Sequence, residues 1–172
     1  MTATYWHALL YLLPSAVVAF GLIRLSRHMY LFSFLTLSGT LVHEGLHLVC
    51  GMLLGARPTS MNVWPRKTPS GYMMGHVAFS NVHWWNAAPV ALAPMLIAPL
   101  IFGVAYWRVS DGWHFDPMQD VVLWIALAPQ LLSCWPSGTD WRLAMRSWPL
   151  LLLGCGAVWL LWGQQIEGFV AK

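Results

Sequence analysis

Long apolar runs separated by short polar stretches dominate the sequence. Most of these runs reach the roughly 20 residues that a helix needs to cross the hydrocarbon core of a bilayer, and the last is short for a span. The pattern predicts an all-α polytopic membrane protein with about five transmembrane helices. The runs cover residues 5–23, 30–56, 86–107, 120–135 and 149–163.

The stretch 57–85, between the second and third runs, breaks this pattern. Prolines and glycines punctuate it, and two short runs with strand character, 60–64 and 72–82, lie between the turns. Both runs are too short and too polar to span a membrane. We expect a short β-hairpin or re-entrant insert that lies against the helices, because irregular backbone at membrane depth must be covered by protein or by a water-filled cavity.

Composition strengthens the membrane interpretation. Of the 172 residues, 58% are hydrophobic and only 9% are charged, whereas about a quarter of the residues in soluble domains are charged. The net charge of +3 comes from scattered basic residues, a pattern that does not indicate nucleic-acid binding. We therefore expect the lipid bilayer as a partner, one transmembrane domain over residues 1–172, and a multi-pass location in the plasma membrane of a bacterium.

The candidate chemistry lies in the second apolar run, in the sequence H-E-G-L-H from His43 to His47. In a helix these two histidines are one turn apart on one face and can bind a single zinc ion. Glu44 directly follows the first histidine and is placed to act as general base toward water activated by zinc. Ionisable residues inside a membrane helix are costly and usually mark a functional site. The alternative is that they are polar residues that pack between helices.

A catalytic zinc site needs a third protein ligand and one open position. If each apolar run crosses the membrane once, the second and fourth runs are parallel, and their C-terminal ends reach the side that carries the insert. Asp140 follows the fourth run on that side and is the best-placed third ligand. Its alternative role is a helix N-cap. His76 and His83, in the insert, remain alternative ligands.

Other polar residues suggest no chemistry of their own. The three aspartates around the start of the fourth run indicate a solvated loop and a helix start. The three cysteines lie in apolar runs without a C-x-x-C spacing, which is typical of small packing residues. These residues are Asp111, Asp116, Asp120, Cys50, Cys134 and Cys155.

With these motifs in hand, residues 30–145 resemble the site-2 protease family of intramembrane zinc metallopeptidases. The resemblance rests on an H-E-x-x-H in a transmembrane helix, a hairpin-like insert, and a later helix followed by an aspartate. The sequence P-S-G-T-D that ends at Asp140 differs from the family's usual L-D-G and is closer to small, divergent zincin-like members. The sequence N-A-A-P that begins at Asn86 is similar to the family's N-x-x-P pattern.

The resemblance implies a metallopeptidase with Zn²⁺ as its cofactor. His43, His47 and Asp140 would be the metal ligands, and Glu44 the catalytic acid and base. The substrate would be a membrane protein or peptide, held in an extended conformation along an edge strand in residues 71–83.

Further sequence predictions concern substrate contacts and other classes of function. His76 and Asn86 are candidate substrate-binding residues. A catalytically silent relative that binds and regulates other membrane proteins is the main alternative function. A metal-ion carrier is less favoured, because the third and fifth runs contain almost no polar residues to line a path.

Overall fold

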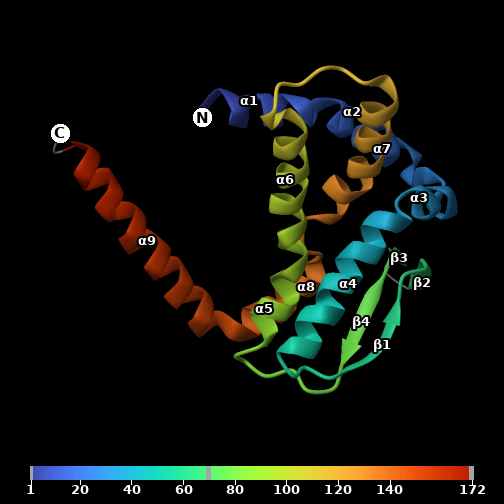
Figure 1. Ribbon diagram of the computed structural model, residues 1–172. Coiled ribbons are helices and arrows are strands. Elements are labelled where there is room, and N and C mark those ends of the chain that lie inside the picture. Colours follow the sequence, from blue (N-terminus) through green and yellow to red (C-terminus); the bar gives the residue numbers. More distant parts are fainter. Residues whose placement is uncertain (1, 69–70, 171–172) are drawn as a thin grey trace.

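The structure is a computed structural model that describes residues 2–68 and 71–170. It is mostly helical, with a small β-hairpin packed against one side of the helix α4 (Figure 1). In chain order the elements are α1 (Thr2–Tyr11), α2 (Leu13–Arg24), the 3-10 turn η1 (Leu25–Arg27), α3 (Met29–Leu35), α4 (Leu37–Leu53), β1 (Pro58–Asn62), β2 (Arg66–Thr68), β3 (Gly71–Met73), β4 (His76–Phe79), α5 (Ala87–Leu92), η2 (Ala93–Leu96), α6 (Ile97–Ser110), α7 (Pro117–Ser133), α8 (Gly138–Ala144), η3 (Met145–Ser147) and α9 (Trp148–Val170).

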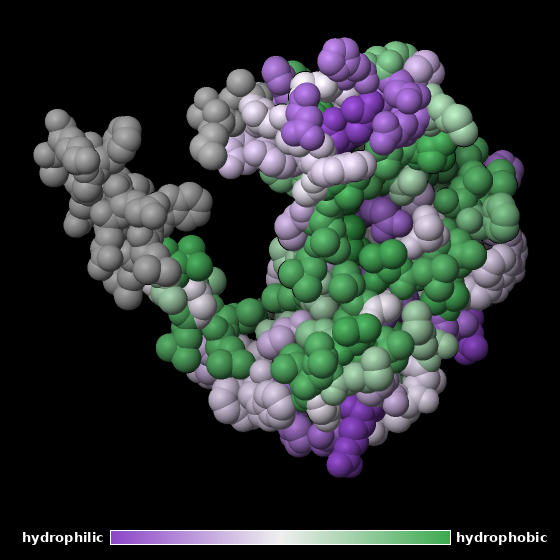
Figure 2. Space-filling view, viewed as in Figure 1, coloured by the Kyte–Doolittle hydropathy of each residue, from purple (hydrophilic) through white to green (hydrophobic). Residues whose placement is uncertain are grey.

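Two helical stretches are long and apolar enough to cross a membrane, namely Thr4–Arg27 and Ala87–Ser110, each of 24 residues. A third crossing is reached only if α7 and the helix that follows it, bent by 53° relative to each other, are counted as one span. Figure 2 shows hydrophobic residues across the middle of the molecule and hydrophilic residues gathered mainly at two ends. A mostly helical, membrane-compatible fold is therefore confirmed, whereas five spans are not supported in the part of the chain that the structure describes.

The second predicted span, 30–56, is divided into α3 and α4 at Thr36. Two hydroxyls turn back onto the helix backbone there: Ser33 Oγ donates to the Met29 carbonyl at 2.7 Å and Thr36 Oγ1 to the Phe32 carbonyl at 2.8 Å. Such bonds to the preceding turn tend to bend helices. The hydrophobic pattern alone did not reveal this break, which leaves α4 with 17 residues.

The insert is a β-hairpin, as predicted. β1 pairs antiparallel with β4, placing Asn62 opposite His76, and β2 pairs antiparallel with β3. The hairpin lies along α4, where Phe79 contacts Gly51 so closely that a side chain at Gly51 would displace the aromatic ring. This contact positions the returning strand beside the helix that carries the H-E-x-x-H.

On its other side α4 packs against α7. Gly39 of α4 touches the backbone carbonyl of Pro129 in α7, which leaves no room for a larger residue. One turn further along both helices, His43 meets the carbonyl of Ser133. From the first contact to the second, the residue numbers rise along both helices. The helices α4 and α7 are therefore parallel, in agreement with the sequence prediction.

The first residues of α7 differ from the sequence expectation. The helix begins at Pro117, a few residues before the expected start near Asp120, and Asp116 caps it by accepting hydrogen bonds from the amides of Met118 and Gln119. Asp120, however, was expected to be solvated and is fully buried. Its carboxylate accepts hydrogen bonds from Tyr11 of α1 at 2.8 Å and from Trp113 at 3.1 Å, and it therefore joins the N-terminal helix to the loop before α7 and to the start of α7.

Candidate metal centre

His43 and His47 lie one turn apart on the face of α4 that points toward α5 and α8. Nδ1 of His43 lies 2.7 Å from the Ser133 carbonyl oxygen, and Nδ1 of His47 lies 2.7 Å from the Val90 carbonyl oxygen. Because a carbonyl oxygen can only accept, each Nδ1 carries the proton and donates it. In the neutral imidazole, Nε2 then presents a lone pair, as the imidazole ligands of metal ions do.

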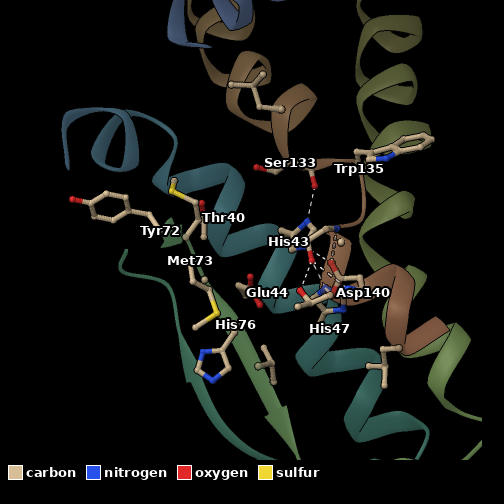
Figure 3. A pocket seen from close by; sticks show the side chains of 18 of the residues that line it. Thr40, His43, Glu44, His47, Tyr72, Met73, His76, Ser133, Trp135 and Asp140 are labelled. Carbon is tan, nitrogen blue, oxygen red and sulfur yellow. Dashed lines mark hydrogen bonds and ion pairs between the residues drawn. The ribbon is translucent and has the colours of Figure 1, made fainter. Parts of the chain in front are cut away.

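The two lone pairs point toward each other and toward Asp140 (Figure 3). The Nε2 atoms are 3.3 Å apart, and the carboxylate oxygens of Asp140 lie 3.5 Å from Nε2 of His43 and 3.3 Å from Nε2 of His47. One ligand atom of each residue lies within 4.8 Å of the others. Three acceptors that converge in this way repel one another unless a cation or a proton lies between them.

Asp140 is held in place by the start of α8. Ser137 is the N-cap, and Asp140 is the third helical residue of a capping box: its Oδ2 accepts from the Ser137 amide at 2.7 Å, and its own amide donates to Ser137 Oγ at 3.3 Å. From the sequence, capping and metal binding are expected to be alternative roles of Asp140. In the structure the capping interaction fixes the carboxylate beside the imidazoles, so the two roles are compatible.

Glu44 lies on the neighbouring face of α4, toward the hairpin (Figure 3). Glu44 is only 6% exposed. A Cβ atom built on Gly75, just before β4, would lie 2.7 Å from Oε1 of Glu44 and 3.0 Å from Cγ2 of Thr40. The absence of a side chain at Gly75 therefore makes the space that the Glu44 carboxylate fills.

A cavity of about 780 Å³ contains all four residues of the candidate centre. Its walls come from α4, from the strand residues 72–77 and from the junction between α7 and α8. Both apolar and polar side chains line it, including Phe32, Leu143 and Arg142. A cavity of this size and mixture is typical of sites that bind a ligand or substrate.

The other sequence candidates have different positions. His76 contributes to the cavity wall, but its ring points away from the three ligands (Figure 3) and is not part of the convergent group. This agrees with strand alternation within β4: Phe79 faces Gly51 of α4, so His76, three residues earlier, faces the opposite side. His83 is exposed and bonds to Asn81. Of the three alternatives for a third ligand, the structure brings only Asp140 to the histidines.

Asn86 lies outside the cavity wall and is fully buried. Its Oδ1 accepts from the amide of His83 at 2.7 Å, while its Nδ2 donates to the carbonyls of Leu54 at 3.3 Å and Asn81 at 3.2 Å. These bonds join the end of α4 to the start of α5. They give Asn86 a structural role that accounts for its polar side chain.

Sequence reasoning missed the two carbonyl groups that orient the histidines, and it missed Gly75. The sequence contains a signal for these carbonyls. Pro94 lies four residues after Val90, and Pro136 lies three residues after Ser133. Proline lacks the amide proton that would otherwise bond to a carbonyl one turn earlier.

The donor set fits zinc on chemical grounds. Two neutral imidazoles and one carboxylate, with a cavity on the open side, are the ligands that catalytic zinc sites combine with a free position. A comparison of the chain with protein-family models, curated proteins and solved structures finds no match. The functional argument therefore depends on the geometry of the centre itself.

Proposed function

We propose that this protein is an intramembrane zinc metallopeptidase that hydrolyses peptide bonds of membrane-embedded or membrane-proximal substrates. The observation that carries the proposal is the convergence of His43, His47 and Asp140 within 4.8 Å, in one cavity with Glu44. The order H-E-x-x-H, hairpin, aspartate along the chain agrees with the resemblance to the site-2 protease family.

His43 Nε2, His47 Nε2 and the Asp140 carboxylate would hold the metal. When bound, zinc supplies Lewis acidity that favours loss of a proton from water and polarises a carbonyl group. The backbone carbonyls of Val90 and Ser133 hold the proton of each imidazole on Nδ1, so that Nε2 faces the position of the metal.

Glu44 acts as general base and general acid. It follows the ligand His43 directly, its carboxylate lies in the cavity, and no hydrogen bond occupies it within the described residues. It accepts a proton from the attacking water and delivers that proton to the nitrogen that leaves. Burial between α4 and the hairpin keeps this carboxylate in one place, which favours proton transfer in a fixed geometry.

The hairpin binds the substrate as an added strand. β3 and β4 are each paired on one side only in the described sheets, and residues 72–77 line the cavity. An extended peptide could pair with the free edge and bring a carbonyl group next to Glu44. An extended conformation also exposes that carbonyl group, which a helix would keep in its internal hydrogen bonds.

The proposed setting is a multi-pass location in a bacterial plasma membrane. Support comes from the two 24-residue apolar helices, from the bent α7–α9 pair and from the hydrophobic middle of the surface (Figure 2). In this setting α4 would lie at membrane depth behind these helices, and the cavity would admit substrates from the bilayer.

The decisive test is a cleavage assay with Glu44→Gln, which keeps the size of the side chain and removes the base. Purified protein in phosphatidylcholine vesicles would be incubated with a library of synthetic transmembrane peptides, and products would be read by mass spectrometry. We expect zinc-dependent cleavage by the wild type and at least about a 100-fold loss in Glu44→Gln, the lower range for removing a general base. The control, Asp111→Asn, changes an exposed acidic residue.

Two results would contradict the proposal. Equal cleavage by wild type and Glu44→Gln would remove Glu44 from the mechanism. Zinc binding without cleavage of any peptide would favour the catalytically silent, protein-binding alternative.

A further inference from the structure

Both histidines of the candidate centre are oriented by backbone carbonyls, and both carbonyls lie where a helix loses a donor. Inside an α-helix each carbonyl accepts from the amide four residues later. A carbonyl engaged in this way is less available to a side chain. The carbonyls of Val90 and Ser133 nevertheless bind the imidazole Nδ1 atoms of His47 and His43 at 2.7 Å.

For Val90 the residue four positions later is Pro94, which has no amide proton. The helix changes there from α5 to the 3-10 turn η2, and the amide of Ala93 bonds to the Val90 carbonyl instead. A carbonyl oxygen has two lone pairs, so one stays available. Nδ1 of His47 uses it, although 43 residues separate the two in the sequence.

The Ser133 carbonyl has an equivalent environment at the end of α7. The residue three positions later is Pro136, which has no amide proton, and the amide of Ser137 is bonded to Asp140. Both local donors are thus absent or engaged elsewhere, and Nδ1 of His43 binds the carbonyl. On both helices a proline removes one of the local amide donors, and the carbonyl that remains available binds an imidazole.

We propose that Pro94 is a positioning residue of the metal centre: by lacking an amide proton it leaves the Val90 carbonyl to Nδ1 of His47 and fixes the tautomer that presents Nε2 to the metal. This inference rests on the proposed zinc site. Pro94 is buried and touches neither metal nor substrate in this role. Its contribution acts through the hydrogen bond of His47.

The alternative tautomer shows what the hydrogen bond achieves. If the proton were on Nε2 of His47, an N–H group would point at Nε2 of His43 and at Asp140, in place of a ligand lone pair. The convergence within 4.8 Å would then be a hydrogen-bonded cluster with no vacancy for a cation. A carbonyl acceptor on the far side of the ring disfavours this arrangement, because Nδ1 would then face it without a proton.

The experiment compares zinc affinity in Pro94→Ala and in a matched ester. Pro94→Ala introduces an amide proton that competes for the Val90 carbonyl. Lactic acid at position 94, introduced by nonsense suppression in cell-free translation, has the same methyl side chain but no amide proton. Pro99→Ala, in the same span and at an exposed position, controls for the general loss of a proline. Zinc would be titrated into detergent-purified apo protein against a competing chelator.

We expect Pro94→Ala to raise the zinc dissociation constant about tenfold, the lower range for loss of a ligand's hydrogen-bond partner. The ester and Pro99→Ala should remain within about twofold of the wild type. Equal affinity in Pro94→Ala and wild type would overturn the inference while leaving the peptidase proposal intact. An ester as weak as Pro94→Ala would also overturn it, because the lost packing would then explain the effect. Absence of zinc binding in folded wild type would overturn both proposals.

A second measurement needs no variant at Pro94 and tests the tautomer on which the inference depends, even if Pro94→Ala fails to fold. In apo wild-type protein labelled with ¹⁵N-histidine, the resonances of His47 are assigned by their absence in His47→Gln. We expect the proton on Nδ1. A proton on Nε2 of His47 would overturn the inference.

Discussion

A carboxylate lies near each end of α7, the fully buried Asp120 and the half-buried Asp140 of α8, and the two carboxylates have opposite environments. Near its start, Asp120 accepts from Tyr11, Trp113 and the amide of Asp116, and it pairs with Arg108 at 2.9 Å. Beyond its end, Asp140 accepts one amide bond in its capping box and otherwise faces two imidazole nitrogens. One carboxylate is surrounded by donors, and the other belongs to a group of acceptors.

This difference separates a structural cluster from a functional one. Buried polar groups that are fully hydrogen-bonded make a fold specific and rigid, and they leave no atom free to bind a ligand. Acceptors that converge without a donor are unfavourable by themselves and become favourable when a cation binds. Asp120 therefore holds the helices together, whereas the Asp140 carboxylate remains available to a cation. Three substitutions test this difference between the structural cluster and the candidate metal centre.

The largest effect on stability is expected from Asp120→Ala. It leaves the guanidinium of Arg108 without its partner in a mostly buried position. We expect a loss of about 3 kcal/mol in the free energy of unfolding, at the lower end for breaking a buried pair because Arg108 keeps some exposure. Zinc per folded chain should not change. Denaturant unfolding in detergent measures the first quantity, and elemental analysis measures the second.

Asp111→Ala is the control, since it changes an exposed acid in the loop before α7 and should stay within about 0.5 kcal/mol. Loss of zinc from folded Asp120→Ala protein would show that the two clusters are not independent.

The next effect is on metal binding, in Asp140→Asn. The amide oxygen can still accept from the Ser137 amide, so the capping box survives, whereas the charge at the centre is removed. We expect zinc affinity to fall more than about 100-fold, because loss of a ligand exceeds loss of a ligand's hydrogen-bond partner. Stability of the apo protein should be nearly unchanged.

Asp116→Asn is the matched control, because Asp116 also caps a helix but lies at the other end of α7. Unchanged zinc affinity in Asp140→Asn would contradict the role of Asp140 as the third ligand. The carboxylates near the two ends of α7 would then not differ in metal binding.

The smallest expected effect concerns the space around Glu44. Gly75→Ala places a methyl group against Oε1 of Glu44 and must displace the carboxylate or the hairpin. We expect hydrolysis of a cleaved peptide to fall by about tenfold or more, because a displacement near 1 Å can cost up to 100-fold in rate. Zinc content should be retained.

Gly45→Ala makes the same change beside the same glutamate, but its added Cβ meets nothing within 4 Å. Full activity in both variants would show that the close approach of the hairpin has no part in placing Glu44.

Much of the candidate site was predictable because its geometry is local. Helical periodicity alone places His43 and His47 on one face with Glu44 next to them. The position of Asp140 also followed from the sequence, because parallel helices bring their C-terminal ends to the same side. Contacts of Gly39 with Pro129 and of His43 with Ser133 confirm that direction.

The errors have physical causes that hydropathy does not measure. Part of the difference between the five expected spans and the two qualifying helices comes from the second run, which divides near Ser33 and Thr36, where hydroxyl groups bond to the preceding turn, although the run is apolar. Asp120 was expected to be solvated because its partners, Tyr11 and Arg108, are distant in the sequence. Asn86 matched a family pattern, yet its three hydrogen bonds all serve the connection between α4 and α5.

The sequence by itself determined the apolar helices, the hairpin between them and the helical spacing of two histidines around a glutamate, because these depend on neighbours in the chain. Only the tertiary structure decided that Asp140, and not His76 or His83, lies with the two histidines, which tautomer the imidazoles adopt and which glycine makes room for Glu44. Those features depend on atoms that meet across 31 residues of chain, for Glu44 and Gly75, to 97 residues, for His43 and Asp140. A hydrogen bond of 2.7 Å requires the packing of whole helices, and no local pattern specifies it.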